Sequence, residues 1–185
     1  MTTAVRTDAE AHGRTERART EARTHGRMDP ARPRRLALVA SKGTLDGAYP
    51  PLILAATAAS LGWEVGIFFT FYGLDIIHKR RHRKLKVAPV GNPAMPVPVP
   101  NLLGALPGMT AAATAMMKGW MKNAHLPDVA EFLDMARESG TKLFACSTTM
   151  GVMGVKEKDL VPGVDIAGAT AFLDFAADAD VSLFV

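Results

Sequence analysis

The chain of 185 residues has one cysteine, Cys146, and so lacks any pair of thiols that could close a disulfide within it. It also lacks an apolar stretch near its N-terminus of the kind that forms a secretory signal. Both absences favour a reducing compartment, and we expect a cytoplasmic protein. The missing second thiol also excludes a dithiol redox enzyme. A thiol peroxidase would need a thiol from another molecule to resolve its sulfenic acid.

Motifs for nucleotides and metals are missing as well. The sequence contains no P-loop, and the pair Gly151 and Gly154 falls short of a G-x-G-x-x-G fingerprint. His78 and His82 have the i, i+4 spacing that two ligands on a helix would need, but the cations around them would repel a metal ion. We therefore expect no metal and no cofactor, and interpret both histidines as part of a solvated basic face.

The net charge of +4 belongs entirely to the first 35 residues. Residues 1–35 hold nine arginines and five acidic side chains, whereas the other 150 residues hold thirteen of each sign. This segment has almost no large apolar side chain, so it is predicted to be a disordered Arg/Thr/Ala/Glu-rich tail. It is either dispensable, with Met28 as the true start, or makes a weak electrostatic contact with RNA or anionic lipid. No specific nucleic-acid partner is expected.

Residues 36–185 are predicted to form one α/β domain. Apolar runs predict five strands at 36–40, 64–70, 142–146, 164–166 and 181–185. Helical periodicity lies between them, with apolar positions at Val129, Phe132, Leu133 and Ala136, and at Ala169, Phe172, Leu173 and Ala176. This alternation is typical of a mostly parallel, doubly wound sheet with helices on both faces, and we expect the flavodoxin-like order 2-1-3-4-5. Ligands of such sheets bind at the carboxyl ends of the strands.

The first predicted helix follows the loop 41–46. Asp46 is a candidate N-cap, and Pro50 and Pro51 are expected in the first turn, where a missing N–H costs little. Gly62 is a plausible terminator because glycine readily adopts the left-handed conformation that ends many helices.

Two unusual segments lie between the second and third predicted strands. Residues 73–86 begin apolar and end basic, which predicts a short helix with a solvated end or, alternatively, a docking patch for an acidic partner. Residues 87–117 carry no charge, but six prolines interrupt them, so membrane contact is expected to be peripheral at most. Five methionines between positions 95 and 121 suit either core filling or an interface. We expect an apolar Pro/Met-rich insertion at about 87–121.

Cys146 ends a predicted strand and precedes a predicted helical turn. A thiol there meets unpaired N–H groups and the positive end of the helix dipole, and both favour the reactive thiolate. The backbone N–H groups of Thr148, Thr149 and Met150 are candidates for holding a sulfur anion, and Lys42 is a candidate positive charge across the cleft. The plainer alternatives are a buried cysteine that only packs, threonines that only cap the helix, and a solvated lysine.

From Leu36 to Val185 the chain resembles the DsrE/DsrF-like family, in particular its DsrE-type subgroup, which is often labelled peroxiredoxin-like. The segments that carry the resemblance are LALVASKGTLDGAYPPLILAATAASLGWEVGIFFTFYGL, the Met-rich segment, LFACSTTMGVMG and GATAFLDFAADADVSLFV. Their order and spacing carry the match, since no single motif is as specific as a paired C-x-x-C zinc site.

The resemblance implies a five-stranded α/β fold, a homo-oligomer, and sulfur trafficking through a persulfide on the cysteine that matches Cys146. It also implies TusA-like sulfur carriers and rhodanese-like donors as partners. The expected function is that of a sulfur carrier, similar to a sulfurtransferase, which exchanges sulfane sulfur with partner thiols. The alternative is an interaction or small-ligand-binding module in which Cys146 is structural.

Overall fold

The computed structural model describes residues 32–88 and 108–185. The chain divides into two units, Met1–Pro33 and Arg34–Val185. The tail predicted for residues 1–35 lies almost wholly outside the described residues, as does the Pro-rich part of the predicted insertion.

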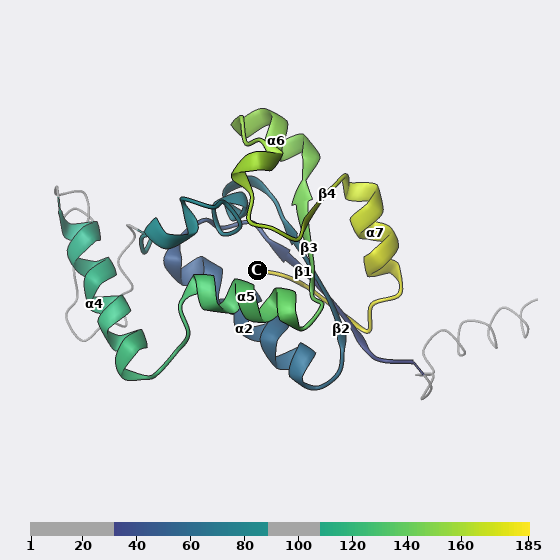
Figure 1. Ribbon diagram of the computed structural model, residues 1–185, viewed down its shortest axis with the longest axis horizontal. Coiled ribbons are helices and arrows are strands. Elements are labelled where there is room, and N and C mark those ends of the chain that lie inside the picture. The colour runs from purple at the N-terminus through teal and green to yellow at the C-terminus, as the bar shows by residue number, and fades with distance from the viewer. Residues whose placement is uncertain (1–31, 89–107) are drawn as a thin grey trace, which may run out of the picture. The chain divides into compact units, whose positions relative to one another are not determined.

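The second unit contains one sheet of five parallel strands with helices between them (Figure 1). Its elements in chain order are β1 (Arg35–Ala40), α2 (Leu45–Ser60), β2 (Glu64–Phe69), the 3-10 turns η1 (Phe71–Asp75) and η2 (His82–Lys84), α4 (Met109–Asn123), α5 (Val129–Glu138), β3 (Lys142–Cys146), α6 (Ser147–Met153), the 3-10 turn η3 (Glu157–Asp159), β4 (Val164–Ala167), α7 (Ala169–Ala177) and β5 (Val181–Phe184). The predicted α/β class and five-stranded sheet are confirmed.

The order of the strands is β4-β3-β2-β1-β5, so the predicted order 2-1-3-4-5 is wrong. β3 pairs with β2 instead of β1, and β5 returns to the open edge of β1. Successive right-handed crossovers over one face move along a sheet in one direction, and α2 and α5 cover the same face. Only the connection through α7, on the opposite face, reverses the direction (Figure 1).

Helix α2 begins two residues earlier than predicted. Its N-cap is Thr44, whose hydroxyl accepts the N–H of Gly47 at 3.2 Å, while Asp46 lies in the first turn. Pro50 and Pro51 consequently fall inside the helix. The predicted terminator Gly62 does adopt a left-handed conformation, with φ of 76°.

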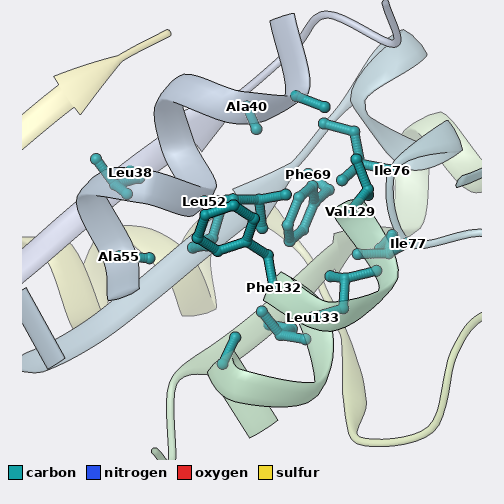
Figure 2. Packing of buried hydrophobic residues seen from close by; sticks show 14 of the residues in the cluster. Leu38, Ala40, Leu52, Ala55, Phe69, Ile76, Ile77, Val129, Phe132 and Leu133 are labelled. Carbon is teal, nitrogen blue, oxygen red and sulfur yellow. The ribbon is translucent and has the colours of Figure 1, made fainter. Parts of the chain in front are cut away.

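The larger core lies between the sheet and the helices α2 and α5 (Figure 2). The rings of Tyr49 and Phe132 meet edge to face with their centroids 5.9 Å apart, which joins the two helices. The predicted apolar stripe of α5 is buried, namely Val129, Phe132, Leu133 and Ala136. Asp128 and Glu131 form a capping box that starts α5 directly after Pro127.

A smaller core lies under α7 on the other face of the sheet. Phe172 stacks on Phe68 at 4.9 Å between ring centroids, and the ring of Phe175 occupies the space beside Gly66, where a Cβ would collide with it. Leu173 was predicted to be buried, but 63% of it is exposed. Phe175 takes its place because residues 172 and 175, three apart, lie on the side of α7 that faces the sheet.

The basic segment after β2 does not form the predicted short helix. It consists of η1, a turn and η2, and its histidines are not part of a solvated face: His78 is 4% exposed and His82 is 7% exposed. Arg83 Nε donates to His82 Nε2 at 3.3 Å, so the other ring nitrogen of His82 carries the proton and donates to the carbonyl oxygen of His78 at 2.9 Å. The cations around these buried rings are exposed, as predicted.

Helix α4 carries all the described methionines of the predicted insertion. Met117 and Met121 pack against the larger core, whereas Met116 and Trp120 are 41% and 47% exposed. Core filling is thus observed for Met117 and Met121, and the predicted interface stays a prediction. Within the described ranges, no helix has the length and apolar character needed to cross a bilayer.

Candidate functional site

The thiol of Cys146 lies at the carboxyl edge of the sheet, on the face covered by α7. Cys146 is the last residue of β3 and pairs with Ala167 at the end of β4. Cys146 is 7% exposed and belongs to the smaller core together with Phe144 and Phe172. On its other side, Thr70 directly follows β2, the neighbour of β3. The parallel register therefore brings residues 70, 146 and 167 to one edge.

Two loops at this edge approach each other closely. The N–H of Thr70 donates to the carbonyl oxygen of Ala40 at 3.0 Å, and the N–H of Gly73 donates to Ser41 at 3.1 Å. A Cβ at position 73 would collide with the carbonyl oxygen of Ala40, so only glycine fits there. The backbone that carries Thr70 is thereby fastened to the end of β1.

Two threonine hydroxyls connect to the thiol. Thr149 lies in the first turn of α6 and donates its hydroxyl to Cys146 Sγ at 3.3 Å. The hydroxyl of Thr70 lies 3.0 Å from that of Thr149. A continuous chain of hydrogen bonds therefore runs from the end of β2, through the first turn of α6, to the sulfur at the end of β3.

This arrangement changes the acidity of Cys146. Burial raises the pKa of the thiol, but the hydroxyl and backbone N–H of Thr149, the hydroxyl of Thr70 and the backbone N–H of Thr148 all lower it. Together the hydrogen bonds outweigh burial, so the pKa lies below its ordinary value. A larger fraction of Cys146 is consequently thiolate, the form that attacks sulfur electrophiles.

The other candidates for holding a sulfur anion differ in their surroundings. The side chain of Thr148 is exposed, and its contribution to the thiol comes from its backbone N–H. Met150 is 6% exposed, and its side chain packs in the larger core. Lys42 is exposed on the loop after β1, and β2 separates it from β3, a distance of about two strand spacings or roughly 10 Å.

Sequence reasoning did not identify Thr70. It proposed a cap role for Thr148 and Thr149, but α6 starts directly at Ser147 with Cys146 itself as its N-cap. The hydroxyl of Thr149 is therefore available to the sulfur. A pairing of β3 with β2 would have pointed to Thr70, whereas the predicted order placed β1 next to β3.

The site has no obvious set of metal ligands. In the parts of the chain that the structure describes, no three His, Cys, Asp or Glu side chains converge in a way that could hold an ion. His78 and His82 are engaged with the backbone and with Arg83, as described above.

Fold and site together define an α/β protein with a buried, hydrogen-bonded thiol of lowered pKa at the carboxyl edge of a parallel sheet. The chain belongs to the DsrE/DsrF/DrsH-like family, whose model matches residues 32–184. The resemblance seen in the sequence is thereby confirmed at the level of the family.

Two known relatives match most of the chain. It is 44% identical over 158 residues to the sulfur carrier protein DsrE2 of Allochromatium vinosum, which covers 82% of this chain and 98% of that protein. It is 32% identical over 162 residues to the uncharacterized protein YrkE of Bacillus subtilis, which covers 82% of this chain and 97% of YrkE. The crystal structure of the ychN protein from E. coli shares the fold, with a TM-score of 0.51 at 12% identity over 82% of this chain and 99% of that chain.

Proposed function

We propose that this protein is a sulfur carrier that holds sulfane sulfur as a persulfide on Cys146 and passes it to or from partner thiols. The observation that carries the proposal is the thiol at the sheet edge, which accepts a hydrogen bond from Thr149 and has a lowered pKa. The similarity to a protein named as a sulfur carrier supports it. A cysteine that only packs would not need donors directed at its sulfur.

Sulfur enters by exchange, without any external oxidant. The Cys146 thiolate attacks the outer sulfur of a donor persulfide, the donor's S–S bond breaks, and the donor thiolate leaves with the electron pair. The product is the Cys146 persulfide. In the reverse direction an acceptor thiolate attacks the outer sulfur, and the bonding pair returns to Cys146 Sγ as thiolate.

The same proposal extends to the partners and the assembly. TusA-like carriers and rhodanese-like proteins would supply or receive the sulfur, in the cytoplasm, and the carrier would be a homo-oligomer. Exposed apolar side chains on the α7 side of the sheet, Leu173 at 63% and Phe184 at 74%, support an assembled state because such groups gain from being covered. Light scattering of the full chain during gel filtration measures the assembly directly.

Intact-mass spectrometry tests the carrier function. The full-length protein is incubated with polysulfide, thiosulfate or a persulfidated TusA-like donor, and we expect a gain of about 32 Da, one sulfur, that dithiothreitol removes. Because Cys146 is the only cysteine, Cys146→Ser supplies a thiol-free control that should gain nothing. Absence of the adduct with every donor, in protein whose Cys146 reacts with iodoacetamide, would favour the binding module with a structural cysteine.

A further inference from the structure

We propose that Thr70 is a positioning residue for Cys146 and acts through Thr149, as the outer member of a directional chain of hydroxyls. Its role in sulfur exchange rests on the proposed function, but its effect on the thiol can be measured without any sulfur donor. Neither the family match nor the name of a relative assigns a role to this residue.

The direction of the chain follows from counting protons. A threonine hydroxyl has one proton to donate and lone pairs with which to accept. Thr149 donates its proton to Cys146 Sγ, so in this arrangement Thr70 donates the hydrogen bond of 3.0 Å between the two hydroxyls, in agreement with the lowering of the thiol pKa by the Thr70 hydroxyl. Both protons therefore point towards the sulfur. Hydrogen bonds in such a chain polarise one another, and each strengthens the next.

The backbone and side-chain contacts of Thr70 suit this positioning role. Its N–H donates to Ala40, and its carbonyl oxygen accepts the N–H of Gly73 at 2.9 Å, so its backbone is fixed from both sides. Thr70 is also the N-cap of η1, a position at which a threonine side chain usually bonds to the turn that follows. Here its side chain makes no such cap, and the hydroxyl lies against Thr149 instead.

The chain of hydroxyls stabilises the Cys146 thiolate in both directions of sulfur exchange. During loading it raises the fraction of Cys146 that is ionised, and this gain exceeds the loss of intrinsic nucleophilicity while the pKa stays above the ambient pH. During discharge the S–S bond breaks and Sγ leaves with the electron pair, so donors that stabilise this anion favour its departure. Loss of Thr70 is therefore expected to slow both steps.

The pH dependence of alkylation tests the inference. The rate constant for iodoacetamide and Cys146 is measured from pH 5 to 10 in the full-length protein and in Thr70→Val, which keeps the shape but removes the hydroxyl. We expect the midpoint to move to higher pH and the rate at pH 7 to fall about 3- to 10-fold. Thr70→Ser retains the hydroxyl and should restore the profile. Thr57→Val, which removes an exposed hydroxyl on α2, should leave it unchanged.

A double-mutant cycle distinguishes a chain of coupled hydroxyls from independent effects of Thr70 and Thr149 on the thiol. If Thr70 acts through Thr149, Thr70→Val has little further effect once Thr149→Val is present. If Thr70→Val shifts the midpoint equally in the unsubstituted protein and in Thr149→Val, the hydroxyls do not act as a chain. An unchanged midpoint in Thr70→Val would also contradict the inference, provided that its thermal unfolding matches that of the unsubstituted protein. Either result would contradict the role of Thr70 without affecting the 32-Da adduct that tests the carrier function. A missing adduct would contradict the carrier function without affecting the alkylation profile, so the two proposals can fail independently.

Discussion

Thr149 Oγ1 donates to Cys146 Sγ across 3.3 Å, three residues along the chain, at the point where β3 becomes α6. The contact exists because α6 begins at Ser147 without any intervening loop, which turns the third following side chain back over the sulfur. An acidic thiol is the chemical result, and it makes the unfolding free energy depend on pH.

The lowered pKa of Cys146 predicts a pH-dependent contribution to folding. The unfolded chain keeps its proton up to the ordinary thiol pKa, near 8.5, whereas the native protein releases it at lower pH. The unfolding free energy should therefore rise with pH between these two values and lose this gain as the pH falls through the native pKa. Urea unfolding from pH 6 to 9.5 measures it. Cys146→Ser, which does not ionise, should show a flatter curve; identical slopes would contradict the prediction.

His78 is expected to destabilise the native protein at acidic pH. Burial lowers its pKa first of all, and Arg81 and Arg80 lower it further, while Asp159 and Asp75 oppose them. His78 therefore binds a proton near pH 6.5 in the unfolded chain, but only at lower pH in the native protein. The unfolding free energy should fall as the pH drops below this value towards the native pKa.

The measurement for His78 is urea unfolding between pH 4.5 and 7.5. His78→Gln should have a lower unfolding free energy at pH 7.5 and a smaller decline towards acid. His125→Asn is the matched control, because this exposed histidine has a φ of 54° that asparagine tolerates, and its decline should equal that of the unsubstituted protein. An undiminished decline in His78→Gln would assign the effect to other groups.

Glu64 connects three neighbouring strands. Its carboxylate bonds to Arg35 of β1 at 2.7 Å and to Lys142 of β3 at 2.8 Å, and the hydrogen bond from Lys142 is the main reason that its pKa is lowered. We expect Glu64→Gln to reduce the unfolding free energy by about 1 kcal/mol, because partly exposed ion pairs are screened by water. Salt at 1 M should remove most of the difference. Glu138→Gln, at the exposed end of α5, should change it by less than about 0.5 kcal/mol.

Gly73 is predicted to be intolerant of any side chain. A Cβ there would collide with the carbonyl oxygen of Ala40, which is backbone and cannot turn aside. Gly73→Ala should cost at least about 2 kcal/mol and should also displace Thr70, three residues earlier, which would slow alkylation of Cys146. Gly119→Ala has open space around it within α4 and should instead stabilise that helix by about 0.5–1 kcal/mol. Differential scanning calorimetry of both variants decides the matter.

Local patterns predicted most of the elements correctly. The runs at 36–40, 64–70 and 142–146 are strands because their continuous apolar side chains suit burial on both faces of a sheet. The stripe of α5 is buried as predicted, because a period of 3.6 residues with a capping box permits few other structures. Prediction was wrong where the local signal was ambiguous: Leu173 and Phe175 both suit an apolar face, and only the docking of α7 over Gly66 selects between them.

The sequence alone determined the lone thiol, its place at the end of a strand, and the helical turn that follows. These features depend on residues close together in the chain, whose conformations are limited by sterics and hydrogen bonding. Only the tertiary structure decided that β3 pairs with β2, since periodicity carries no information about which strand lies beside which. That pairing brings Thr70 to Thr149, 79 residues away. The burial of His78 and His82 is likewise visible only in the tertiary structure. The acidity of Cys146 therefore arises partly from the helix that follows it and partly from Thr70 at the end of β2, whose pairing with β3 no local pattern reveals.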